Sequence, residues 1–366
     1  MVLRNVRINL LMITSVLICI GIVMIYSASS IYSLEKYHDS MFFLKRHLSF
    51  ILIGLVLTAL VMSFDYRLLS RYSRPLLATA LVFLVLVLIP GVGREVSGAR
   101  RWFRFGVFSF QPAEFANVMM IVYLADFICR KQDQMRSFVR GIMPVMAMLG
   151  MISLLILMQP DLGTTLSVCV VVFLMLFISG ARLTYLAGIV LAALPALYLL
   201  VFSVPYRRMR IMAFLNPWAD PRGSGFQIIQ SQVALGSGGL FGVGLGHSQQ
   251  KLFYLPAAHT DFIVSIIGEE LGMLGTISVI VLFIAFLRLG LTIVKHATDK
   301  FGYFLGLGLL MLIAFKATVN IGVSCGLLPT KGLPLPFISY GGSSLIFDMV
   351  SVGLLLNIAK TGESSV

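Results

Sequence analysis

One carboxylate is placed where it could do acid–base chemistry. Asp261 ends the segment His259-Thr260-Asp261, directly before a long apolar stretch. A carboxylate in a loop is usually only solvated, but a partly apolar rim would raise the pKa of Asp261. The imidazole of His259 is next to it in the sequence. Because a carboxylate with a raised pKa can act as a general base, Asp261 is the candidate catalytic residue.

Two groups of basic residues lie in segments that we place outside the membrane. They are Arg94, Arg100, Arg101 and Arg104 around Trp102, and Arg207, Arg208, Arg210, Arg222 and Lys251. These groups could contact anionic lipid headgroups. Arginine also binds phosphate oxygens in a bidentate fork, and arginine is disfavoured in external loops. This placement favours an anionic substrate such as a lipid-linked phosphate.

Six ionisable residues fall inside or at the edge of apolar stretches, where a charge is costly and each is a candidate site residue. They are Glu114, Asp126, Glu269, Glu270, Lys316 and Asp348. Asp126 and Arg130 have the spacing of an ion pair within one helix. Lys316 and Asp348 could pair between helices. Glu269 and Glu270 would point about 100° apart, so at most one should face a given cavity.

The composition indicates that the bilayer is the solvent of this chain. Of its 366 residues 58% are hydrophobic and 12% are charged, and the mean hydropathy is +0.97. The charged share is about half of the ~25% that soluble domains carry. These values exclude a soluble enzyme, a nucleic-acid binder and a disordered chain, despite the net charge of +13.

Ten apolar stretches are long enough to suggest membrane spans, and they predict an all-α polytopic membrane protein with a single domain over residues 1–366. They lie near 9–28, 47–64, 74–90, 111–129, 141–159, 162–180, 183–204, 262–287, 302–325 and 343–359. We expect the first to be a retained helix and not a signal peptide. Ten spans put both termini on one side, and tight clusters of Arg and Lys in short loops favour the cytoplasmic side.

Three segments outside the spans attract attention. The long external loop 205–261 is too apolar for a solvated linker, so we expect an ordered, partly helical cap. Its glycine-rich run 236–246 completes no nucleotide-binding pattern and predicts tight turns or close backbone approach. The runs 159–163 and 331–344 break helices. The second, with two prolines and a Gly-Gly pair, predicts a re-entrant segment, with a plain external loop as the alternative.

These motifs resemble the family of shape, elongation, division and sporulation (SEDS) proteins, which polymerise peptidoglycan glycan strands. The resemblance rests on Gln159–Gly163, on Asn216–Pro221, on the glycine-rich run, on His259–Ile263 and on Lys331–Ser344, and it covers residues 10 to 358. Lys331-Gly332 and the 251–271 stretch are more similar to the branch that serves cell division than to the branch that serves elongation.

The resemblance implies transfer of glycan from lipid II, a disaccharide-pentapeptide on a polyprenyl pyrophosphate. Asp261 matches the family's essential carboxylate and is expected to take the proton of the acceptor hydroxyl. Arg101 and Trp102 match a conserved external pair, and Arg101 could hold the donor pyrophosphate. The expected substrate-binding set is Arg101, Trp102, Glu114, His259, Lys331 and Ser339.

Two positions depart from the family pattern, Asn117 and Ala257. Family members usually carry Lys three residues after the carboxylate that corresponds to Glu114, and here that residue is Asn117. An ion pair within that helix is therefore missing, which argues against a salt-bridge role for Glu114. Neither this change nor Ala257, where Glu is common, removes the expected base.

The resemblance also implies the setting of the reaction. Expected partners are lipid II, membrane lipids, a class B penicillin-binding protein that cross-links the product, and other proteins of the division machinery, but no nucleic acid. A divalent cation, Mg²⁺ or Mn²⁺, could assist at the pyrophosphate, and no nucleotide or organic cofactor is expected. The expected location is the inner membrane at the division septum, with the site on the external face. A precursor flippase, an elongation-type polymerase and a scaffold with a decayed site are the alternatives.

Overall fold

The computed structural model describes the chain except for residues 1, 97, 106–107, 253 and 364–366. The longer helices are α1 (Val2–Tyr37), α2 (Phe42–Ser63), α4 (Ser73–Leu86), α5 (Pro112–Arg130), α6 (Met143–Leu157), α7 (Leu162–Ile178), α8 (Leu183–Phe202), α11 (Ile263–Lys295), α12 (Lys300–Ser324) and α13 (Ser343–Glu363). The shorter helical segments are α3 (Leu68–Arg71), η1 (Gln132–Gln134), η2 (Phe138–Ile142), α9 (Pro205–Leu215), η3 (Pro217–Ala219) and α10 (Phe226–Ser237).

The ten longer helices lie where the ten apolar stretches predict them. Within the described part of the chain, eight helices are long and apolar enough to cross a membrane. The other two, α4 and α7, are apolar but shorter. The predicted helical polytopic membrane protein is therefore confirmed, while the number of ten crossings stays a prediction.

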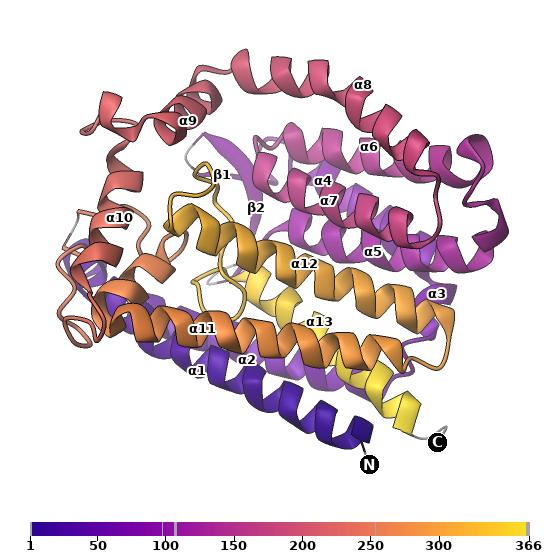
Figure 1. The fold of residues 1–366 in the computed structure, drawn as a ribbon, viewed down its shortest axis with the longest axis horizontal. Helices are drawn as coiled ribbons and strands as arrows, with labels where there is room; N and C mark the ends of the chain where they lie inside the picture. The colour runs from indigo at the N-terminus through magenta and orange to yellow at the C-terminus, as the bar shows by residue number, and fades with distance from the viewer. Residues whose placement is uncertain (1, 97, 106–107, 253, 364–366) are drawn as a thin grey trace.

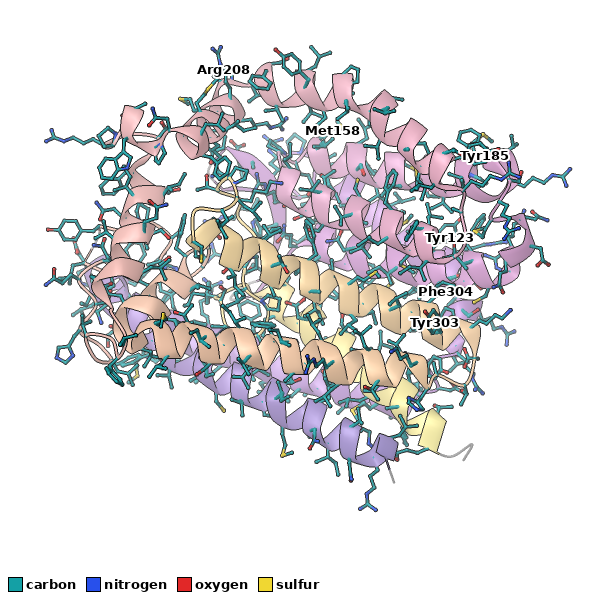
Figure 2. All side chains as sticks on the ribbon, in the orientation of Figure 1. Tyr123, Met158, Tyr185, Arg208, Tyr303 and Phe304 are labelled. Atoms are coloured by element: carbon teal, nitrogen blue, oxygen red, sulfur yellow. The ribbon has the colours of Figure 1, made fainter. Side chains whose placement is uncertain are left out.

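The long helices run side by side, and both termini lie at the same end of the bundle (Figure 1). At the opposite end lie α9 and α10, which are the helical parts of the predicted cap. Arg208 of α9 extends away from the bundle at this end, whereas Tyr185 and Tyr303 lie toward the other end (Figure 2). Almost every residue of α5 is buried, whereas α8 lies at the edge of the bundle with Leu186 as its buried residue. The buried helices α5, α12 and α13 supply most of the intramembrane charges described below.

The described residues of 91–110, predicted only as an external segment, contain a small antiparallel sheet. Its strands are β1 (Arg94–Val96), β2 (Ala99–Phe105) and β3 (Phe108–Phe110), in the order β1-β2-β3. Phe103 pairs with Phe110, and both rings pack against Phe83 of α4. The sheet is thereby fastened to the helices, and β2 presents Arg101 and Trp102.

The non-helical segment between α12 and α13 is folded into the protein and is not an exposed loop. Leu335, Phe337 and Ile338 are each at most 1% exposed. Helix α1 approaches this segment so closely that a Cβ on Gly21 would lie 2.7 Å from the carbonyl oxygen of Phe337. The geometry agrees with the predicted re-entrant segment, in which irregular backbone is tolerated because protein surrounds it.

Candidate active site

Asp261 lies in a tight turn directly before α11. Its backbone N–H donates to the carbonyl of Ala257 at 3.1 Å, and Ala257 has a φ of 58°. The amide nitrogen of Asn320, a buried residue of α12, donates to the carbonyls of Asp261 at 3.1 Å and of Leu333 at 2.8 Å. This one amide therefore ties the turn of Asp261 to the segment between α12 and α13.

The pKa of Asp261 is raised to about 6, chiefly by burial. The nearby guanidinium of Arg210 opposes this shift, and the carboxylate of Asp161 adds to it. Such a pKa suits a general base at neutral pH, because the group is mostly ionised and still accepts a proton readily. Burial thus acts on the pKa of Asp261 in the predicted direction, while its role as the base stays a prediction.

Arg210 of α9 is the basic residue of the long loop that approaches Asp261. Its guanidinium covers the ring of Tyr206, 4.5 Å from the ring centroid, and hydrogen-bonds the Tyr206 hydroxyl. It also donates to the carbonyl of Thr330 at 3.1 Å. These contacts hold α9 over the segment between α12 and α13.

Lys331 directly follows Thr330 in the segment between α12 and α13. Burial lowers the pKa of its ammonium to about 8, and no carboxylate of the described residues forms a salt bridge with it. At the next residue, Gly332, a Cβ would lie 3.4 Å from the Asp261 carboxylate. A partly desolvated cation without a carboxylate partner thus stands one residue from the contact with Asp261, where it could bind an anion.

Arg101 has protein partners in this structure. Its guanidinium donates to the carbonyls of Gln159 at 2.7 Å and Pro160 at 2.6 Å, at the turn between α6 and α7. The next residue, Asp161, caps α7 by accepting from the backbone N–H of Thr164. Arg101 therefore fastens the predicted Gln159–Gly163 turn, and its contact with a pyrophosphate stays a prediction. Its neighbour Trp102 is half-buried on β2.

His259 and Ser339 fix the backbone around Asp261. The His259 ring packs on Phe43, with centroids 4.6 Å apart, and burial lowers its pKa to about 4, so the ring is neutral at physiological pH. Ser339 donates to the carbonyl of Thr260 at 2.6 Å and accepts from the backbone N–H of Leu335 at 2.9 Å. Direct substrate contacts of His259 and Ser339 stay predictions.

The expectation that Glu114 lacks a salt bridge is wrong. Lys316 of α12 donates to Glu114 at 2.7 Å, and also to Asp348 and to the hydroxyl of Ser344, both at 3.0 Å. The missing lysine of α5 is therefore compensated by a lysine of another helix, and the suggested pairing of Lys316 with Asp348 is confirmed. The amide of Asn117 is fully buried, with no hydrogen-bond partner in the described part of the chain.

Two further expectations about charge need correction. Lys251 does not extend from the external surface toward an anion, because its side chain is buried and pairs with Glu270 at 3.1 Å. Glu269 and Glu270 also do not face different surroundings. Both carboxylates contact the same segment, 248–251, because that segment folds across the two adjacent residues. The predicted pair of Asp126 with Arg130 is confirmed at 2.7 Å.

Comparison with known proteins decides the family. Residues 7–364 match the family of cell cycle proteins FtsW, RodA and SpoVE. The chain belongs to the FtsW/RodA/SpoVE family. It is 47% identical to the probable peptidoglycan glycosyltransferase FtsW of Geobacter metallireducens over 96% of this chain and 93% of that one. It is 45% identical to stage V sporulation protein E of Bacillus subtilis over 96% of both chains.

Solved structures agree with this assignment to the FtsW/RodA/SpoVE family. A chain from work on the structural coordination of polymerization and crosslinking by a peptidoglycan synthase complex has a TM-score of 0.77 and 30% identity, covering 96% of this chain and 97% of that one. The rod shape determining protein RodA of Thermus thermophilus has a TM-score of 0.71 and 28% identity, covering 96% and 95%. The family resemblance inferred from the motifs is confirmed.

Two residues of this site, Arg210 and Asn320, were not predicted from the sequence. Arg210 is one of five basic residues in its loop, and nothing in the spacing distinguishes it from Arg207 or Arg208. Asn320 is a single polar residue within an apolar stretch, which could have marked it as a buried hydrogen-bonding group. Both contact backbone more than 90 residues away in the chain, and local patterns do not report such contacts.

Proposed function

We propose that this chain is a peptidoglycan glycosyltransferase that polymerises glycan strands from lipid II. Relatives that carry the name probable peptidoglycan glycosyltransferase FtsW are 47% and 49% identical to it over 96% of its length. The observation that carries the chemical assignment is Asp261, a half-buried carboxylate in a tight turn beside Gly332, with a pKa raised to about 6 and with Arg210 nearby.

In the proposed reaction, Asp261 removes the proton from the acceptor sugar hydroxyl as that oxygen attacks the anomeric carbon of the donor. The new glycosidic C–O bond forms while the bond from the anomeric carbon to the pyrophosphate oxygen breaks. The electron pair leaves with the polyprenyl pyrophosphate. Arg210 and Lys331 supply positive charge near the base, where it stabilises the charge that builds on this leaving group.

The described residues do not form a metal site with three or more protein ligands. No three His, Cys, Asp or Glu residues among them come together as possible ligands. The Asp161 carboxylate, whose charge raises the pKa of Asp261, already accepts hydrogen bonds from Thr164 and Gln111. We therefore derive no step through a metal, and the expected Mg²⁺ or Mn²⁺ is limited to a cation that substrate phosphates would bring.

The cellular setting is part of the proposal. The chain is a multi-pass membrane protein, and we place its site on the external face of the inner membrane, with both termini cytoplasmic. The similarity to a chain of a peptidoglycan synthase complex supports a partner that cross-links the product, which we take to be a class B penicillin-binding protein. The identity to FtsW proteins supports a role in septal synthesis with other division proteins.

The decisive assay is glycan-strand formation from labelled lipid II. It uses the full chain with its penicillin-binding protein, a transpeptidation inhibitor and Mg²⁺. Asp261→Asn keeps the shape of the side chain but removes the base, and it should lower the rate at least ~100-fold. Asp126→Asn is the matched control, because it makes the same change at a buried carboxylate that pairs with Arg130 and is not part of the site.

Two outcomes would overturn parts of the proposal. Strand formation by Asp261→Asn at the wild-type rate would remove Asp261 as the base. No strands from wild type, with the complex shown to be intact, would refute the polymerase. The charged cluster of Glu114, Lys316 and Asp348 inside the bundle would then make lipid-linked precursor transport the next hypothesis to test.

A further inference from the structure

Helix α11 is broken at Gly272, and the glycine-rich run 236–246 closes the break. Gly272 has a φ of 69° and a ψ of −166°. The N–H groups of Met273 and Leu274 donate to the carbonyls of Gly239 at 2.9 Å and Leu240 at 3.2 Å. In a continuous helix they would donate to the carbonyls of Glu269 and Glu270 instead.

The carbonyls of Glu269 and Glu270 also find partners in the glycine-rich run. They accept from the N–H groups of Val243 at 2.9 Å and Gly244 at 3.1 Å. Two helical hydrogen bonds across the break are thus replaced by four hydrogen bonds to another segment. Backbone groups inside a membrane protein must find their hydrogen bonds within the protein. The glycine-rich run therefore supplies the backbone hydrogen bonds that α11 loses at Gly272.

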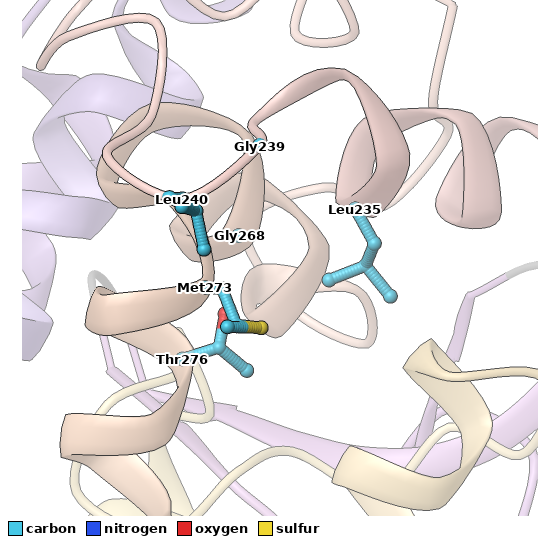
Figure 3. Close-up of a pocket in the computed structure, with 6 residues that line it drawn as sticks. All are labelled: Leu235, Gly239, Leu240, Gly268, Met273 and Thr276. Atoms are coloured by element: carbon cyan, nitrogen blue, oxygen red, sulfur yellow. The ribbon is translucent and has the colours of Figure 1, made fainter.

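Glycine is required at this junction for close approach. A Cβ on Gly242, which has a φ of 81°, would lie 2.2 Å from the carbonyl oxygen of Glu270. A Cβ on Gly238 would lie 1.9 Å from the carbonyl oxygen of Gly268. Figure 3 shows the junction, where a recess of about 390 Å³ is lined by Leu235, Gly239, Leu240, Gly268, Met273 and Thr276. The glycine-rich run therefore performs the close packing that its sequence predicts.

The side chains of the same two glutamates hold the segment that follows the run. The Glu269 carboxylate accepts from the Ser248 hydroxyl and from the backbone N–H of Gln249 at 2.9 Å. The Glu270 carboxylate accepts from Lys251 Nζ at 3.1 Å and from the hydroxyl of Ser27 on α1 at 2.6 Å. Both glutamates are at most 2% exposed, so these contacts are shielded from water.

These contacts close a loop that contains Asp261. One end of the loop is the segment 248–251, and the other end is the Glu269–Glu270 pair. Between them, the Ser339 hydroxyl and the Asn320 amide donate to the carbonyls of Thr260 and Asp261. A loop fixed at its base has fewer conformations to lose when its middle is ordered.

We propose that Glu269 and Glu270 are positioning residues for Asp261. By holding both the glycine-rich run and the segment 248–251, they keep the Asp261 carboxylate in place beside Arg210 and Gly332. This inference rests on the proposed function, in which Asp261 is the base. It assigns a task to the two glutamates that needs no contact between them and the substrate.

The test compares Glu270→Gln, Lys251→Met and the double variant in the full chain with its partner protein. A misplaced base should lower kcat about 100-fold for Glu270→Gln and leave KM for lipid II nearly unchanged. A loosened loop also hydrates Asp261, so the acid limb of the pH–rate profile should move from about pH 6 toward about pH 4. Because the two side chains share one ion pair, the double variant should be no worse than the more damaging single variant.

Amide hydrogen exchange gives a readout that does not depend on activity. Glu270→Gln should speed exchange of the backbone amides in residues 248–252 and 254–261, whereas the control Asp126→Asn should leave their exchange unchanged. Gly242→Ala should act like Glu270→Gln, while Gly236→Ala, where a Cβ meets no atom within 4 Å, should have no effect. This second pair keeps the test decisive if Glu270→Gln does not fold.

The outcomes separate this inference from the proposed function. If wild type forms strands and Glu270→Gln shows an unchanged acid limb and unchanged exchange, the positioning role is refuted. A rise in KM with an unchanged kcat would refute it as well, because that pattern indicates lost binding. If wild type forms no strands, the proposed function fails, and the exchange experiment alone decides whether the glutamates hold the loop.

Discussion

Lys316 joins three helices through its ammonium group, and its replacement tests the charge balance inside the bundle. Nζ donates to Glu114 of α5, and to Asp348 and Ser344 of α13, at 2.7 to 3.0 Å. An ammonium has three N–H bonds, so all of them are used. The side chain is 1% exposed, so water does not compete for these contacts.

The two carboxylates and the single ammonium predict an order of stability among variants. Lys316→Met leaves two carboxylates without their cation, and breaking a buried ion pair costs about 3–5 kcal/mol. Glu114→Gln leaves one carboxylate with one ammonium, and its amide oxygen can still accept from Nζ. We expect a cost of about 1 kcal/mol, the size of one typical hydrogen bond.

Thermal unfolding of the purified protein in detergent measures this difference. An unfolding entropy of about 2.1 cal/mol/K per residue gives about 0.77 kcal/mol/K for a chain of this length. Lys316→Met should therefore lower Tm by about 4–6 °C, and Glu114→Gln by about 1 °C. The triple variant with Lys316→Met, Glu114→Gln and Asp348→Asn should recover stability relative to Lys316→Met, because no unpaired charge remains.

Two results would refute this reasoning. A Tm of Lys316→Met equal to or above that of Glu114→Gln would show that the cluster does not depend on its single cation. A triple variant as unstable as Lys316→Met would show that the loss comes from packing around the lysine stem and not from unpaired carboxylates.

Three further predictions concern the site and its surroundings. With a pKa of about 6 for Asp261, the polymerisation rate should fall about tenfold from about pH 7 to about pH 5, and a flat profile would contradict the assignment of the base. Arg210→Gln removes a cation that lowers this pKa, so the acid limb should move to higher pH in the same titration; a move to lower pH would be inconsistent. Gly21→Ala should lower Tm and activity because its Cβ would meet the Phe337 carbonyl, whereas Gly150→Ala, which meets no atom within 4 Å, should change neither.

The sequence predicts the helices well because the bilayer imposes a minimum apolar length on each span. It also predicts the Asp126–Arg130 pair, since residues four apart share one face of a helix. The pair of Glu114 with Lys316 joins residues 202 positions apart, and no local spacing reports it. The family pattern misled at this point because it carries the lysine on the same helix.

The small sheet and the break in α11 were missed for a different reason. Aromatic residues and arginines alternate irregularly over 99–110, and this does not give the strict period of two that indicates a strand. Gly272 is one glycine in a long apolar helix, where glycine is common. Only its position opposite the glycine-rich run makes it a break, and that position depends on the tertiary fold.

The irregular segments around Asp261 are held by buried polar groups, three from helices and Ser339 from the segment between α12 and α13. Asn320 and Ser339 hold the turn of Asp261, and Glu269 and Glu270 hold the segment before it. Irregular backbone inside a membrane protein must find its hydrogen bonds in the protein. A helix break therefore brings fixed donors and acceptors with it, and these same groups restrict the motion of the chain between the breaks. The half-buried carboxylate of Asp261 is thereby held in one position, which is what a general base needs in order to meet a hydroxyl at hydrogen-bonding distance.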